Sequence, residues 1–301
     1  MKKVILLVFA FCLMVSFSFA VDGNVGAGQT YATIQEAIDA STSGDVINVY
    51  PGTYNQDEAN GRDPITGGPG SSNFNIFVNK SVTIRGVTAG GVPITNYSGV
   101  LAFVIAKRNT PSGDASTFFV QADNVTISGV DVTAFDDPAF NFKTFSVIGE
   151  NVTIKNCALH ARDQVSSIYM YDPRFVSGTN TSYIQSYRFE ANSLDAGGIY
   201  ASGIRFSSGA GWTGSVVNRV IIGNTINGGS YGIEFVGPQA DPWDVYPVGA
   251  ATVSTNSFSG QDKGSIVAWG EYQSAVGYGN IDWDGIWTNN TFDKAVIVKT
   301  P

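Results

Sequence analysis

Cysteine and histidine are scarce in this chain of 301 residues, which has two cysteines and one histidine. Cys12 lies in an apolar segment at the start of the chain, so Cys157 is the only thiol in the remainder. This scarcity excludes a disulfide framework and a zinc site built on cysteine pairs. Because Cys157 falls within an apolar repeat, we expect a small buried side chain rather than a reactive or metal-binding thiol.

Long apolar runs are absent after the first 20 residues. Residues 1–20 are typical of a secretory signal: two lysines precede an apolar run from Val4 to about Val15, and Ser18-Phe19-Ala20 has the small-x-small form of a cleavage site. A membrane anchor is the competing interpretation, but the run is short for a span and a polar segment follows directly. We therefore expect a secreted or cell-surface protein that starts at Val21 and has no membrane span after cleavage.

Positive charge is also in short supply. Removal of residues 1–20 would leave 15 basic and 25 acidic residues, and the basic residues form no stripe. A nucleic-acid partner is therefore not expected. The same balance is a poor match for polymers rich in uronic acids unless a bound cation or a local basic patch reverses the sign.

A six-residue unit recurs along the chain and is clearest in Ile221-Ile222-Gly223-Asn224-Thr225-Ile226. Its variants begin at Ile84, Ile127, Ile154, Phe189, Ile221, Val253 and Trp287, with intervals of 43, 27, 35, 32, 32 and 34 residues. The units are β-branched and alternating, with Gly and Asn where a helix would favour Ala or Leu. A strand that recurs once per turn predicts a parallel β-helix of about seven to eight coils stacked at about 4.8 Å.

The fourth position of this unit predicts one column of stacked side chains. It is occupied by Val87, Val130, Cys157, Asn192, Asn224, Asn256 and Asn290. The column is apolar in the first three coils, and we expect the four asparagines to form a ladder of amide hydrogen bonds. A second strand per coil is visible at residues 203–206, 232–235 and 265–269. It places Arg205 and Glu234 one above the other on the outer face as an exposed ion pair, for which simple surface solubility is the preferred interpretation.

A short helix is predicted ahead of the first coil, over residues 33–41. Thr33 and Glu36 form a capping box, and Ile34, Ala37 and Ile38 give one apolar stripe, so the helix is suited to cover the open end of the stack. A strand from Val46 to Tyr50 follows.

Residues 33–40 and 44–54 together resemble the N-terminal cap and first coil of the pectin-lyase-like right-handed β-helix superfamily, which includes pectin methylesterases and many secreted bacterial surface proteins. The resemblance covers about 25 residues and implies the fold. It implies no single function, since the scaffold carries lyases, hydrolases, esterases, epimerases and adhesins.

Two further segments bear on domain organisation. Residues 55–73 are polar and rich in glycine, and we expect a long loop there before a strand from Phe74 to Val78. The last element, Ala295 to Lys299, is predicted to be an apolar strand with no capping helix after it. We therefore expect either a fragment of a longer surface protein, with further domains as partners, or an end-to-end dimer.

Three loops contain an Asp-Pro pair at intervals near one and two coil periods, so they are candidates for an acidic and aromatic groove. The candidate carbohydrate-binding residues are Asp137, Tyr171, Asp172, Arg174, Asp241 and Trp243. Aromatic rings stack on sugar faces and carboxylates accept hydroxyl hydrogens. The alternative is that Asp-Pro is an ordinary turn starter. No cofactor is expected apart from Ca²⁺, for which Asp136 and Asp137, with Asp131 or Asp163, are the candidate ligands.

Catalytic motifs are missing. His160 precedes Arg162-Asp163 and is raw material for a general base, but a surface turn residue is the simpler interpretation. The sequence motifs of polygalacturonases, pectin methylesterases and pectate lyases do not occur, and neither does a nucleophile elbow or a phosphate loop. In some β-helix lyases an Arg or Lys acts as the catalytic base. The candidates here are Arg162, Arg174 and Lys143, and their spacing in the sequence does not favour one over the others.

The sequence therefore predicts an all-β, single-stranded right-handed parallel β-helix over residues 21–301. Its expected role is a noncatalytic module that binds an extracellular or cell-wall polysaccharide, or a structural surface module. The alternative is a polysaccharide lyase or glycoside hydrolase acting on an acidic extracellular polymer.

Overall fold

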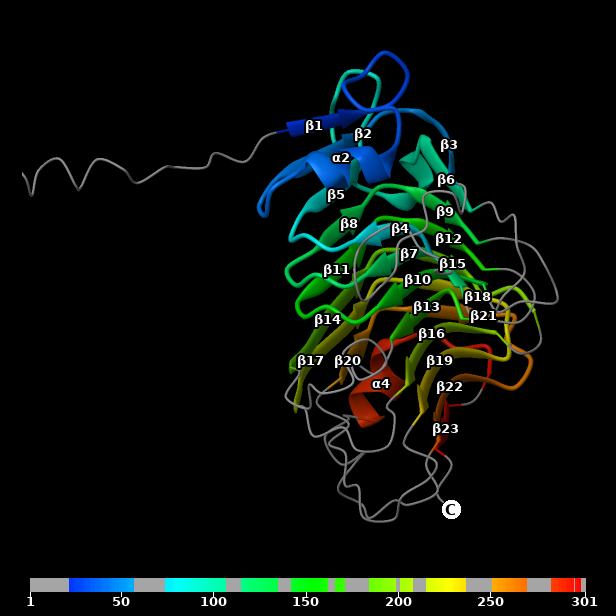
Figure 1. Cartoon of the computed structure of the whole chain (residues 1–301). Coiled ribbons are helices and arrows are strands. Elements are labelled where there is room, and N and C mark those ends of the chain that lie inside the picture. Colours follow the sequence, from blue (N-terminus) through cyan, green and yellow to red (C-terminus); the bar gives the residue numbers. More distant parts are fainter. Residues whose placement is uncertain are drawn as a thin grey trace, which may run out of the picture.

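The structure is a computed structural model that describes residues 22–56, 74–106, 115–134, 142–161, 166–170, 184–198, 201–207, 215–236, 251–269, 283–294 and 296–298. Every pairing between its named strands is parallel, and the strands form three sheets that run the length of one coiled stack (Figure 1). The predicted right-handed parallel β-helix is confirmed.

Each sheet collects one strand from every turn of the chain. Sheet A consists of β1 (Asp22–Val25), β2 (Val46–Val49), β5 (Thr83–Gly86), β8 (Thr126–Ser128), β11 (Val152–Lys155), β14 (Ile184–Glu190), β17 (Ser215–Ile222) and β20 (Ala251–Ser254). Sheet B consists of β3 (Gly52–Gln56), β6 (Ala102–Ala106), β9 (Asp131–Thr133), β12 (Ala158–His160), β15 (Ser193–Asp195), β18 (Thr225–Asn227) and β21 (Ser257–Ser259). Sheet C consists of β4 (Phe74–Val78), β7 (Ala115–Val120), β10 (Phe142–Val147), β13 (Ile168–Met170), β16 (Ser202–Ser207), β19 (Tyr231–Val236), β22 (Gly264–Trp269) and β23 (Val296–Val298). In the described part of the chain, seven successive coils each supply one strand to A, B and C in that order, which agrees with the predicted number.

The core is made of side chains stacked in register between the sheets. In sheet A one inward column is formed by Ile47, Ile84, Ile127, Ile154, Phe189, Ile221 and Val253, all of them buried. The repeated unit places the same kind of side chain at the same point of each coil. The apolar burial that stabilises the stack is therefore continuous along it.

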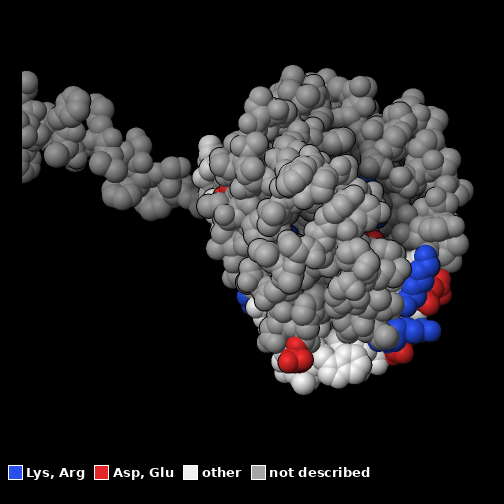
Figure 2. Space-filling model, turned by 90° about the horizontal axis from the view of Figure 1, so that it is seen from below, with Lys and Arg blue, Asp and Glu red and all other residues white. Residues whose placement is uncertain are grey.

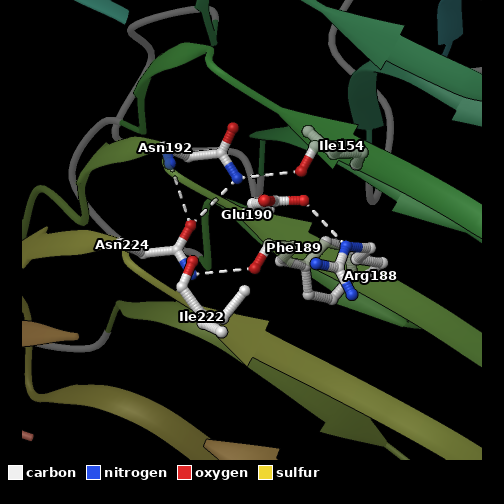
Figure 3. Close-up of polar contacts among 7 residues, drawn as sticks. All are labelled: Ile154, Arg188, Phe189, Glu190, Asn192, Ile222 and Asn224. Carbon is white, nitrogen blue, oxygen red and sulfur yellow. Dashed lines mark hydrogen bonds and ion pairs between the residues drawn. The ribbon is translucent and has the colours of Figure 1, made fainter. Parts of the chain in front are cut away.

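The corner between sheets A and B holds the predicted asparagine ladder (Figure 3). The Nδ2 group of Asn192 donates to Oδ1 of Asn224 at 3.0 Å, and Asn224 and Asn256 each donate to the next asparagine at 2.9 Å, ending at Asn290. Each Oδ1 also accepts the backbone N–H of the preceding rung, beginning with that of Cys157 at 3.0 Å. At the sharp corner these backbone groups cannot pair within the sheets, and the asparagine side chains supply their hydrogen-bond partners.

In five of the coils, the residue before the fourth position of the repeated unit has a left-handed backbone. Its φ is positive at Gly129, Asn156, Ala191, Gly223 and Thr255, in five consecutive coils. Glycine and asparagine adopt this conformation at little cost, whereas Ala191 and Thr255 are strained there. The corner geometry is therefore conserved from coil to coil even where the residue type does not favour it.

Helix α2 (Ile34–Ala40) lies at the N-terminal end of the stack and has the predicted capping box, in which Thr33 Oγ1 accepts the Glu36 N–H and Glu36 accepts the Thr33 N–H. Gln35 makes two hydrogen bonds to Phe77 of β4, accepting from its N–H at 2.7 Å and donating to its carbonyl at 3.3 Å. Because β4 is the edge strand of sheet C, these bonds satisfy backbone groups that would otherwise be open to another chain.

Two elements differ from the sequence prediction. The expected strand at Trp287 is instead helix α4 (Trp283–Asn289), which packs on the edge strand β20, although Asn290 keeps its place in the ladder. Trp283, Ile286 and Trp287 have helical spacing, and Ile286 is buried in the core. The prediction of a strand at Trp287 was therefore wrong, whereas the apolar strand expected near the end of the chain is present as β23. In the second coil the expected strand stops at Gly86. An insertion that includes the 3-10 helix η2 (Tyr97–Gly99) separates it from β6.

Candidate functional site

The six residues predicted to bind carbohydrate are Asp137, Tyr171, Asp172, Arg174, Asp241 and Trp243, and all lie outside the described residues. Arg162 and the candidate calcium ligands Asp136, Asp137 and Asp163 also lie outside them. The structure does describe His160, Lys143, Cys157 and Asp131. A candidate site can therefore lie on one of the three outer sheet surfaces or in a pocket that described residues line.

The outer surface of sheet C is largely buried. Phe74, Phe77, Phe119 and Ile148 form a second apolar cluster on it, with the Phe74 and Phe119 rings stacked at 4.0 Å. Lys143, one of the three candidate bases, is also almost fully buried on this sheet. Where it is described, this surface is not an open groove.

The predicted ion pair on sheet C is present but is not exposed as expected. Arg205 Nη1 lies 3.7 Å from Glu234 Oε2, and the Glu234 side chain is only 10% exposed. The Ser202 hydroxyl donates to the same carboxylate oxygen at 2.7 Å. Alternation along the strand predicted that both charges point outward, but it gave no information about what else packs on this surface.

The outer surface of sheet B is open and carries mostly hydroxyl, amide and carboxylate side chains. We call it the sheet B face. Its outward side chains are those of Thr53, Asn55, Leu101, Phe103, Ile105, Asp131, Thr133, His160, Ser193, Asp195, Thr225, Asn227, Ser257 and Ser259. Most are polar, and none is lysine or arginine. This sheet runs down one side of the stack from β3 to β21 (Figure 1).

An apolar stripe crosses the sheet B face near its N-terminal end. Leu101 and Phe103 point outward two residues apart and are 41% and 42% exposed, and Ile105 continues the stripe. Phe103 is paired in register with Thr53 of β3 on one side and with Asp131 of β9 on the other. An exposed ring flanked by a hydroxyl and a carboxylate on adjacent strands is a platform on which a sugar ring can stack.

His160 lies next to this platform. Its Nε2 atom is 3.3 Å from Oδ2 of Asp131, and its register partner on the following strand is Asp195. The imidazole is 41% exposed, whereas the Asp131 side chain is 15% exposed. The sequence suggested Asp163 as the neighbouring carboxylate of His160, and the structure shows Asp131, from the preceding coil.

A pocket of about 350 Å³ lies at the N-terminal edge of the same face. It is lined by Gly26, Ala27, Ala32, Thr33 and residues 51–55, so it lies between the loop that leads into α2 and strand β3. The Tyr54 hydroxyl lies 2.7 Å from the Tyr50 carbonyl oxygen and 3.1 Å from that of Val25, and burial raises the pKa of this phenol. Thr53 borders the pocket and is also the register partner of Phe103, so the pocket and the platform are contiguous.

Other candidate chemistry is not supported where it can be tested. Cys157 is fully buried, and this burial raises the pKa of its thiol to about 12, as expected for a core residue. Within the described ranges, no group of three or more His, Cys, Asp or Glu side chains is arranged to hold a metal ion. The same part of the chain has no helix long and apolar enough to cross a membrane. In the view from below, described side chains of both charge signs lie side by side at one margin of the molecule (Figure 2).

No protein-family model matches the chain, and no curated protein matches it. Solved structures with a similar course include the rice weevil pectin methyl esterase, with 14% identity, a TM-score of 0.47 and coverage of 85% of this chain and 70% of that one. Escherichia coli YbhC has 10% identity, a TM-score of 0.49 and coverage of 93% and 71%. The Aspergillus niger pectin methylesterase has 14% identity, a TM-score of 0.38 and coverage of 91% of each chain.

The architecture is that of a right-handed parallel β-helix. The sheet order, with one strand per coil in each of three parallel sheets, agrees with the resemblance of the first coil. Identities of 14% or less carry no activity over to this chain.

Sequence reasoning missed the sheet B face, although one signal for it was present. The fifth position of the repeated unit runs Asp131, Ala158, Ser193, Thr225, Ser257 and Thr291, a small and polar column beside the ladder. Phe103 did not fit that alignment, because the insertion after Val87 shifts sheet B of the second coil by more than ten residues.

Proposed function

We propose that the chain is an extracellular, noncatalytic polysaccharide-binding β-helix that holds a sugar chain along the sheet B face. The observation that carries this proposal is the exposed Phe103 ring, held between Thr53 and Asp131 on a rigid sheet and continued by His160. A ring on a sheet loses little freedom on binding, because the strands already fix its position.

The polar groups beyond Phe103 suit an extended ligand. Adjacent strands place hydroxyl, carboxylate and amide groups in two columns at a spacing of about 4.8 Å, so a linear polymer would meet similar groups repeatedly. The extracellular location rests on the signal predicted in residues 1–20, and processing at Ala20 in a secreting host is its test.

Affinity electrophoresis of residues 21–301 through gels that contain neutral or acidic polysaccharides tests the proposal. Phe103→Ala should weaken binding of the retained polymer at least about tenfold, the loss typical of a central aromatic contact. Val92→Ala is the matched control, because Val92 is 61% exposed but lies in the insertion outside the sheet B face. Equal retardation of both variants and the native protein would refute this placement of the ligand.

A lyase or hydrolase is the second candidate, and the Asp131–His160 contact favours it, because an imidazole beside a carboxylate can act as a general base. Incubation with the same polymers, followed by assays for unsaturated products and new reducing ends, separates the two functions. Cleavage that is lost in His160→Gln would establish the enzyme and overturn the noncatalytic proposal.

A further inference from the structure

We infer that the pocket beside Thr53 takes the terminal unit of an uncharged glycan, whose next units lie over Phe103. This inference rests on the proposed function. It adds that the protein binds the end of the glycan and that the sugar is uncharged.

The pocket is small and closed on one side. Its volume of about 350 Å³ is near the lower end of the range of about 300–1,000 Å³ that is usual for small-molecule sites. The loop before α2 lies across its N-terminal side, beyond which sheet B has no further described strand. A polymer lying along the sheet B face would therefore meet a wall at this point, so one or two units at its end fit, and an internal stretch does not.

The wall is preformed. The Gly26 N–H donates to the Tyr31 carbonyl at 3.0 Å, and the Tyr31 N–H donates to the Asn24 carbonyl at the same distance. Gly26 has φ of 142°, and a Cβ added there would lie 2.8 Å from the Tyr54 hydroxyl, so this loop approaches Tyr54 too closely for a side chain. Little ordering of this segment is then required when a ligand enters.

The lining selects an uncharged ligand. It consists of Gly, Ala, Thr, Pro, Tyr and Asn residues, none of which carries a charge. Among the described residues, the carboxylate nearest in sequence is that of Glu36, which already accepts the N–H groups of Ala32 and Thr33 at 3.0 and 3.1 Å. A uronate would bring a carboxylate to a lining whose described residues include no cation, which costs binding free energy, whereas hydroxyl groups can pair with Thr33, Thr53 and Asn55.

Ala32→Tyr tests the inference because it fills the pocket. Ala32 is exposed, and its hydrogen bond to Glu36 is made by the backbone N–H, so the fold should persist. Ala27→Tyr fills the pocket from another lining residue and guards against a local folding defect. Ala89→Tyr, at an exposed turn outside the pocket, is the matched control, and unchanged urea midpoints for all three confirm folding.

The measurement is calorimetric titration with β-1,4-linked glucose, xylose and mannose oligomers of one to six units, with oligogalacturonides as the charged comparison. We expect one neutral series to bind, with the mono- or disaccharide as its shortest ligand, and the pocket-filling variants to weaken every length at least tenfold. Phe103→Ala should weaken the hexamer and leave the shortest ligand unaffected.

Three results would overturn the inference. The first is that Ala32→Tyr and Ala27→Tyr leave the affinity unchanged while Phe103→Ala abolishes binding. This result would contradict the pocket ligand but would still support the proposed function. The second is preference for the oligogalacturonides. The third, no binding of any oligomer or polymer by the native protein, would remove the proposed function together with the pocket ligand.

Discussion

Replacement of the central rung of the asparagine ladder by alanine should be one of the most destabilising single substitutions in the chain. Asn224 Oδ1 accepts hydrogen bonds from the Asn192 backbone N–H and side-chain amide, both at 3.0 Å. Its Nδ2 group donates to the carbonyl oxygens of Phe189 (Figure 3) and Ile222. The same group donates to Asn256 Oδ1. The substitution Asn224→Ala removes all of these bonds from a fully buried corner.

The magnitude follows from what is left behind. The Asn192 side-chain amide keeps the Ile154 carbonyl as an acceptor, and Asn256 Oδ1 keeps the Asn224 backbone N–H as a donor. The Asn192 backbone N–H and the Phe189 carbonyl each lose the partner that Asn224 supplied. At about 1–3 kcal/mol for each buried group left unpaired, the free energy of unfolding should fall by about 2–6 kcal/mol.

Urea unfolding followed by far-ultraviolet circular dichroism measures this loss from the midpoint and the slope. Asn227→Ala, in the same coil, is the control. Asn227 is exposed and its side chain accepts one hydrogen bond, from the Ser259 hydroxyl, so the expected loss is about 0.5 kcal/mol. Asn290→Ala, at the half-buried end of the ladder, should fall between the two. A loss for Asn224→Ala no larger than that for Asn227→Ala would show that the ladder does not stabilise the stack as argued here.

Two further predictions concern the same corner. Burial raises the pKa of the Cys157 thiol from 9.0 to about 12, so on raising the pH the unfolded chain loses this proton before the folded chain does. The contribution of the protonated thiol to the free energy of unfolding is therefore intact below pH 9 and is lost as the pH rises toward 12. Between pH 9 and about pH 10.5 the native protein should lose about 1.5 kcal/mol more than Cys157→Ala in urea unfolding, and parallel pH profiles would contradict this. Ala191 has a left-handed backbone with φ of 52°, so Ala191→Gly should raise the free energy of unfolding by about 0.5–1 kcal/mol. Ala158→Gly, in a β-strand, should lower it by a similar amount, and a loss in both variants would exclude backbone strain at Ala191.

The sequence predicted the fold because stacking repeats the same environment in each coil. A residue type that suits one coil therefore suits the next, and the inward isoleucines and the ladder from Asn192 to Asn290 recur at nearly equal intervals. The capping box at Thr33 was equally predictable, since its interactions are confined to one helical turn.

The same assumption of regularity explains the errors. Aligning Trp287 with the other first positions predicted a strand, but Trp283, Ile286 and Trp287 have the spacing of a helix, and α4 forms there. The alignment also assumed that the second coil continues through Val87 without an insertion. It therefore did not place Phe103 on the sheet B face. The depth of Glu234 was mispredicted for another reason: alternation indicates which side of a strand a side chain takes but not what packs on that side.

The pocket had no signal in the sequence at all. It forms because the loop from Gly26 to Thr33 packs beside strand β3, and no repeat relates the two segments. The rest of the stack presents similar corners and columns from one coil to the next, and a ligand would find little there to distinguish neighbouring coils. Recognition of one particular point on a solenoid requires a departure from the repeat. On the described part of the sheet B face, the exposed Phe103, the Asp131–His160 contact and the wall at Gly26 are such departures, and they lie together at the N-terminal end.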